Sequence, residues 1–219
     1  MEDDFGFNLK NIVNSSVTIL PSKQILVGDR LLWDLRALKE VVIPEGVERI
    51  AGYWFSSSVI ESIEIAASVR ELDANAFHCC KKLRSISFQT DSRLWKIGDG
   101  CFEYSGLKEF IAPPGLREIG DAVFWNCSNL KRVALNEGLE ALDDQDDDMN
   151  YGGTFSCSGI EEITLPSTLR RMSQMTFFGC NRLRTIDVKS GCQADFSGLE
   201  LSNFTITIPL GEVIGDVCL

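Results

Sequence analysis

Eight cysteines and one histidine are the residues of this chain whose types could support nucleophilic or metal chemistry. A catalytic cysteine needs a nearby base, and His78 is the immediate neighbour of Cys79. Adjacent residues on a tight turn rarely present their side chains to one another, so we interpret His78 as an ordinary surface or turn residue. A single histidine excludes a multi-histidine metal site, and no cysteines are spaced Cys-x-x-Cys, which argues against structural zinc.

An acidic run over residues 143–150 could attract calcium through its carboxylates. Three of its aspartates alternate as in the first half of a calcium-binding loop: Asp144, Asp146 and Asp148. However, Met149 stands where that motif needs glycine, and Phe155 stands where it needs a bidentate glutamate. We expect a solvated acidic loop, and weak calcium binding there stays an open alternative.

Length and charge exclude several functional classes. The 219 residues are 44% hydrophobic and 24% charged, which suits one folded domain. A formal charge of −11 disfavours nucleic acid and anionic membrane surfaces as partners. No apolar run approaches the ~18 residues of a membrane helix, and the start, Met1-Glu2-Asp3-Asp4, is unlike a secretory signal. The expectation is a soluble chain without membrane insertion.

A repeat of about 23 residues must position these side chains. Seven units share the pattern L-x-x-I-x-L and begin at Leu38, Ile60, Leu83, Leu107, Leu130, Ile160 and Leu183. The last four positions of the pattern alternate between apolar and other residues, which predicts one half-buried parallel strand per unit. A second inward corner follows each strand.

A phenylalanine recurs after the second corner of six units and predicts a stacked column: Phe55, Phe77, Phe102, Phe124, Phe155 and Phe177. Three residues later, serine and cysteine alternate: Ser58, Cys80, Ser105, Cys127, Ser158 and Cys180. Backbones two units apart lie ~9 to 10 Å from one another, beyond the reach of a disulfide. We therefore interpret these three cysteines as small buried hydrophobic residues, and reduced thiols favour the cytoplasm.

The segment from Leu107 to Cys127, repeated in register, resembles the BspA-like class of leucine-rich repeats. The resemblance implies a strand-rich solenoid of the α/β repeat class, with one parallel strand and a short helical turn per unit; an all-β assignment is the alternative. It also implies a surface that binds other proteins, often as a cell-surface adhesin, and neither an enzyme nor a cofactor protein.

The two ends of the chain read as caps of a single domain. Residues 1–37 are predicted to form an N-terminal cap, with an edge strand from Val17 to Leu20 and a short helix from Asp29 to Leu38. Residues 38–219 then form the solenoid, in which a degenerate eighth unit begins near Asn203. The C-terminus lacks an obvious polar cap, which suggests a fragment.

Outward strand residues form the face that repeat proteins commonly use for binding. Five acids and one arginine lie among them, and the candidate partner-binding residues are Glu40, Glu64, Glu109, Ile111, Arg132, Glu162 and Asp187. This pattern favours a protein partner with a basic surface. The same residues would also suit a sheet face that is merely soluble, and this alternative stays open. A stripe of His78, Trp125 and Phe178 is interpreted as packing between units rather than as a binding ridge.

Two functional classes remain. One is an intracellular interaction scaffold, favoured by the free cysteines and by the lack of a signal segment. The other is a fragment of a cell-surface adhesin that binds host or extracellular proteins, favoured by the family resemblance and the uncapped end.

Overall fold

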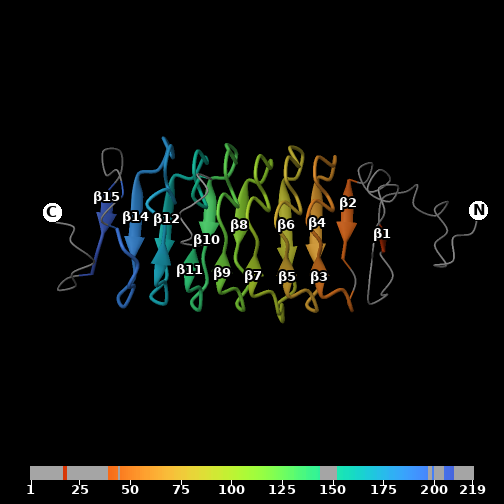
Figure 1. Ribbon diagram of the computed structural model, residues 1–219, viewed down its shortest axis with the longest axis horizontal. Helices are drawn as coiled ribbons and strands as arrows, with labels where there is room; N and C mark the ends of the chain where they lie inside the picture. The colour runs from red at the N-terminus through yellow and green to blue at the C-terminus, as the bar shows by residue number, and fades with distance from the viewer. Residues whose placement is uncertain are drawn as a thin grey trace, which may run out of the picture.

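The computed structural model describes residues 17–18, 39–43, 45–143, 152–196, 199 and 205–209. Most of the predicted N-terminal cap, including the helix expected from Asp29 to Leu38, lies outside these residues, as do residues 144–151. The described part forms a solenoid whose coils stack along its long axis (Figure 1).

Two parallel sheets run along one side of the solenoid and contain the predicted strands. The first holds β1 (Val17–Thr18), β2 (Glu40–Val42), β4 (Ser62–Ile65) and β6 (Ser85–Phe88). The second holds β8 (Glu109–Ile111), β10 (Arg132–Ala134), β12 (Glu162–Leu165), β14 (Thr185–Val188) and β15 (Thr205–Thr207). In β4, Ile63 and Ile65 are buried while Ser62 and Glu64 face outward, which is the alternation that the sequence predicts.

A third parallel sheet has six short strands that the sequence analysis did not anticipate. Its members are β3 (Arg49–Ile50), β5 (Glu71–Leu72), β7 (Lys96–Ile97), β9 (Glu118–Ile119), β11 (Ala141–Leu142) and β13 (Arg171–Met172). The second residue of each strand is the predicted second inward corner, and all six of these residues are buried. Each coil thus contains a long strand, a short strand and a turn.

The expected short helical turn is wrong, because no helix occurs among the described residues. The segments around the phenylalanines are six-residue or shorter turns in which left-handed residues interrupt any helix. The second residue after the phenylalanine has positive φ throughout: Ser57, Cys79, Tyr104, Asn126, Cys157 and Gly179. An α-helix cannot pass through such a residue. The all-β alternative therefore describes the observed coils.

The predicted phenylalanine column is confirmed and forms the axis of the core. Successive ring centroids lie 5.1, 5.2, 5.7, 5.3 and 5.9 Å apart from Phe55 to Phe177, with interplanar angles between 0° and 11°. Five of the six rings are fully buried, and Phe177 is nearly so. Stacking buries each unit against the next, which a single unit cannot do alone.

The alternating serines and cysteines form buried pairs between adjacent units. The hydroxyl of Ser105 lies 3.3 Å from the sulfur of Cys127, whose thiol donates to the carbonyl of Phe102 at 3.0 Å. The same arrangement joins Ser58 to Cys80 and Ser158 to Cys180. The cysteines of the turns carry free thiols: Cys79, Cys80, Cys101, Cys127, Cys157 and Cys180. Cys218 lies outside the described ranges.

The sheets continue past the seven coils among the described residues. β1 pairs in parallel with β2, within the segment from Val17 to Leu20 where an edge strand is predicted. β15 pairs in parallel with β14, where Thr205, Ile206 and Thr207 align with Thr185, Ile186 and Asp187.

Candidate interaction surface

The seven predicted binding residues lie in two rows of outward positions on the long-strand face, divided between its two sheets. The first row contains Glu40 in one sheet, and Glu109, Arg132 and Glu162 on three consecutive strands of the other. The second row lies two residues further along the strands and contains Glu64, Ile111 and Asp187. Each of these residues directly follows a buried residue of its strand. All seven side chains are exposed. We call this surface the strand face.

The electrostatic character of the strand face is negative but not uniformly so. Arg132 forms an ion pair with Glu109 at 3.5 Å, and both side chains are more than half exposed, so the pair is weak. Within the described residues, no ion pair engages Glu64, Glu162 or Asp187. These carboxylates remain available to a partner.

A basic margin, which the sequence analysis did not single out, borders the strand face where the chain enters each long strand. Its members are Lys39, Arg84, Lys108, Lys131 and Arg184, interrupted by Glu61 and Glu161. The two acids pair with Lys39 at 3.3 Å and with Lys131 at 3.6 Å. The margin therefore carries mainly positive charge beside the mainly negative strand face.

Asp143 corrects the expectation of a solvated acidic loop. This residue lies at the end of β11 with only 2% of its surface exposed. Its carboxylate accepts hydrogen bonds from the backbone N–H and hydroxyl of Thr154 and from the hydroxyl of Thr176. Burial raises its pKa to about 6, although the hydrogen bonds oppose the shift. Asp143 is thus a structural residue, while the rest of the acidic run lies outside the described residues.

The side chains of His78 and Cys79 contact each other, contrary to the expectation for adjacent turn residues, but the surroundings of Cys79 do not favour its thiolate. His78 Nε2 lies 3.6 Å from the Cys79 sulfur and 3.8 Å from Glu103 Oε2. Burial raises the pKa of the Cys79 thiol, which lowers the thiolate fraction that a nucleophile needs. The His78 ring instead packs edge-on against Tyr104, as the packing interpretation expects.

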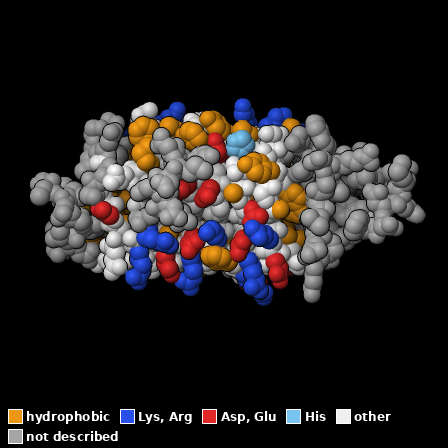
Figure 2. Space-filling model, viewed as in Figure 1, with side chains coloured by type: hydrophobic (Ala, Val, Ile, Leu, Met, Phe, Trp, Pro, Cys, Tyr) orange, Lys and Arg blue, Asp and Glu red, His pale blue; other side chains and the backbone are white. Residues whose placement is uncertain are grey.

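Hydrophobic side chains gather along the edge formed by the turns (Figure 2). The ring centroids of Tyr104 and Trp125 lie 6.0 Å apart, so Trp125 packs against the neighbouring unit. Phe178 is half exposed, and for this residue the packing interpretation is incomplete. Among the described residues, no group of three histidines, cysteines or acids is placed to hold a metal ion.

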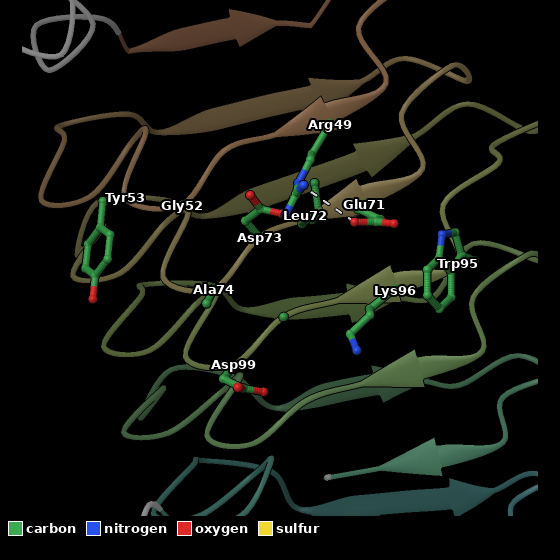
Figure 3. Close-up of a pocket in the computed structure, with 11 residues that line it drawn as sticks. Arg49, Gly52, Tyr53, Glu71, Leu72, Asp73, Ala74, Trp95, Lys96 and Asp99 are labelled. Carbon is green, nitrogen blue, oxygen red and sulfur yellow. Dashed lines mark hydrogen bonds and ion pairs between the residues drawn. The ribbon is translucent and has the colours of Figure 1, made fainter. Parts of the chain in front are cut away.

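A shallow cleft of about 580 Å³ lies on the six-stranded sheet and was missed by the sequence analysis. Figure 3 shows charged side chains between two aromatic residues, Tyr53 and Trp95. Basic and acidic residues alternate across the short strands here: Arg49 on β3, Glu71 on β5, Lys96 on β7 and Glu118 on β9. This row repeats at the residue before each second corner, so aligning the units would have revealed it. Tyr53 and Trp95 occupy two different repeat positions, so aligning the units does not bring them into one column.

Parallel strands, a buried phenylalanine axis and an exposed sheet face define a leucine-rich-repeat solenoid. The chain belongs to the family described as the BspA type leucine rich repeat region, whose model matches residues 26–147 and 96–213. This confirms the predicted resemblance. Repeats of this family are generally protein-interaction or adhesin-like surfaces and are typically non-enzymatic.

Solved structures show the same fold. A leucine-rich repeat protein from Bacteroides ovatus is 26% identical, with a TM-score of 0.66, and the match covers 88% of this chain and 50% of that one. The pneumococcal vaccine antigen PcpA is 24% identical, with a TM-score of 0.61, over 71% of this chain and 42% of that one. The chain therefore spans half or less of these two proteins. No curated protein matches it. No helix suited to crossing a membrane occurs in the ranges that the structure describes.

Proposed function

We propose that this solenoid is a non-enzymatic protein-interaction scaffold whose strand face binds a protein with a basic surface. The observation that carries the proposal is the parallel register, which aligns Glu109, Arg132 and Glu162 on adjacent strands. Glu64 and Asp187 occupy the next outward position of their own strands. Separately, each exposed carboxylate contributes little. Together they form a field that steers a basic partner and rejects an acidic one.

The strand face also offers apolar contact area within its acidic rows. Ile111 is 63% exposed and lies near the centre of the array, beside the weak pair between Glu109 and Arg132. An exposed aliphatic side chain near the centre of a charged face can act as an anchor, because interface energy concentrates in a few central side chains. The basic margin restricts the orientation of a partner, since a misplaced basic patch would meet Arg84, Lys108 and Lys131.

Charge reversal tests the proposal directly. The variant Glu64→Lys, Glu109→Lys, Glu162→Lys changes the strand face. A matched control reverses three acids that lie away from the strand face: Glu48, Asp91 and Glu140. Both variants change the total charge equally. Quantitative pull-downs from an extract of the source organism should lose salt-sensitive partners only with the first variant, by about tenfold or more. Recovery of the same partners by both variants would exclude the strand face as the binding surface.

A further inference from the structure

The cleft on the six-stranded sheet is separate from the strand face and from its proposed partner. It spans β3, β5 and β7 and the turns that follow them. Its volume of about 580 Å³ lies within the range of small-molecule sites, and its outer side is open (Figure 3). An open cleft of this shape suits a chain-like ligand laid across the sheet better than a compact one.

Close packing of the turns makes the floor of the cleft. A Cβ atom on Gly98 would lie 2.7 Å from the backbone nitrogen of Ala74, and one on Gly52 would lie 2.8 Å from the Ala74 carbonyl oxygen. Both contacts are with backbone, so side chains larger than hydrogen cannot be accommodated without a shift. Gly52 and Gly98 therefore form the floor of the cleft, because they have no side chains to fill it.

The polar groups of the cleft carry both signs of charge, with one acid in excess. Two bases, Arg49 and Lys96, stand against three acids, Glu71, Asp73 and Asp99. Arg49 Nε donates to Asp73 Oδ1 at 2.5 Å, and Lys96 Nζ lies 3.3 Å from Glu118 on the next strand. Guanidinium and carboxylate groups have more donors and acceptors than these contacts use. The cleft therefore offers donors beside acceptors, without a strong net field for a strongly charged ligand.

Two aromatic rings lie at opposite ends of the cleft (Figure 3). Tyr53 is 59% exposed and Trp95 is 36% exposed. Tyr53 also has φ of 61°, a left-handed conformation that disfavours a bulky residue; the equivalent positions of the next two units carry Asn75 and Gly100. The conformation belongs to the repeated turn, since Ala122 at the same position also has positive φ, and Tyr53 differs from these residues in presenting an exposed aromatic ring beside the cleft.

We propose that this cleft binds a neutral oligosaccharide. Sugar hydroxyls both donate and accept, which matches alternating carboxylate and cationic groups, and the apolar C–H faces of sugar rings stack on tyrosine and tryptophan. A polyanion would meet three carboxylates, and an extended cationic peptide would meet two bases. A ligand that touches both rings crosses β5, where Glu71 and the Arg49–Asp73 pair supply hydrogen bonds.

Binding of defined oligosaccharides tests the proposal. The probes are neutral hexasaccharides of glucose, mannose, xylose, galactose and N-acetylglucosamine, with oligogalacturonate and a heparin hexasaccharide as charged counterparts. Isothermal titration of the full chain should detect at least one neutral probe and weaker or no binding of the charged ones. Trp95→Ala and Tyr53→Asn should each weaken that probe by about tenfold or more, whereas Trp95→Phe should retain most of the affinity. Asparagine is chosen for position 53 because it tolerates positive φ.

Phe178→Ala provides the matched control, because it removes an exposed aromatic ring outside the cleft. It should leave oligosaccharide affinity unchanged, and circular dichroism should show native folding for every variant. Failure of all neutral probes to bind would overturn the proposal. So would undiminished binding by the folded Trp95→Ala and Tyr53→Asn variants, or a preference for the charged probes. None of these outcomes bears on the strand face.

Discussion

Ionisation of Asp143 should lower the free energy of unfolding, because the charged carboxylate is buried in the folded protein. The carboxyl group has a folded-state pKa of about 6 against an ordinary value of 3.8, because desolvation outweighs its hydrogen bonds. A difference of about two pKa units corresponds to about 3 kcal/mol of unfolding free energy. Since the folded-state pKa is raised, this stability is fully present below about pH 4 and is lost as the pH rises through about 6.

Asp143→Asn removes the ionisation and preserves much of the contact geometry. The amide oxygen can still accept from Thr154. The amide N–H₂ can donate to the hydroxyl of Thr176, whose own proton is then free to turn to the Ser173 carbonyl, 2.7 Å away. Urea unfolding followed by circular dichroism, at several pH values from about 3 to 8, measures both proteins. Because all other titrating groups are shared, wild type should lose about 3 kcal/mol more than the variant across this range.

Two results would refute this reasoning. Equal pH dependence of the two proteins would mean that Asp143 has the same pKa folded and unfolded. A larger loss by the variant at high pH would mean that hydrogen bonding to the ionised carboxylate outweighs burial. Thr176→Val offers a second check: it removes a donor that lowers the pKa of Asp143, so the pH midpoint of the stability loss should move upward.

Further predictions concern the core and the thiols. Phe102→Ala should destabilise the chain by about 3–5 kcal/mol in urea unfolding, because it leaves a cavity in the phenylalanine column. Phe178→Ala, at a half-exposed position, should change the unfolding free energy by less than about 0.5 kcal/mol. Among the cysteines of the described ranges, alkylation of the native protein should modify the half-buried Cys79 and Cys157 first. Four buried thiols should react only after unfolding, because burial raises their pKa and so lowers the fraction of reactive thiolate. The pKa is raised to about 11 for Cys80 and Cys180, to about 12 for Cys127, and well above its ordinary value for Cys101. Early labelling of Cys80, Cys127 or Cys180 would contradict the buried Ser–Cys pairs, and early labelling of Cys101 would contradict its burial.

The long strands and the phenylalanine column were predictable because the same apolar residue types recur at fixed positions of the repeat. The short strands were not, because each contributes two residues and a single inward side chain, such as Leu72, which is too little to show alternation. The helical turn was wrongly expected because its left-handed positions are filled by Ser57, Cys79 and Tyr104, which carry no glycine signal.

The strand-face residues followed from the same alternation, since strand register converts sequence spacing into rows. Asp143 was misplaced because an acidic run looks uniformly solvated by composition. Its repeat position offered a signal: it directly follows the inward Leu142, as Asp73 follows Leu72 at the start of the corresponding turn. The cleft could not be found in this way, because Tyr53 and Trp95 come from different repeat positions and are brought together only by stacking.

A photo-cross-linking side chain at Ile111 tests the central claim most directly, because this residue is exposed within the acidic rows. The account predicts cross-links from position 111 to a basic protein that high salt abolishes. It also predicts their loss when Glu109 and Glu162 are replaced by lysine. The same group at Phe178, on the turn edge, should yield none of these products. Equal capture from position 178, or capture from 111 that survives both the salt and the charge reversal, would contradict binding through the strand face.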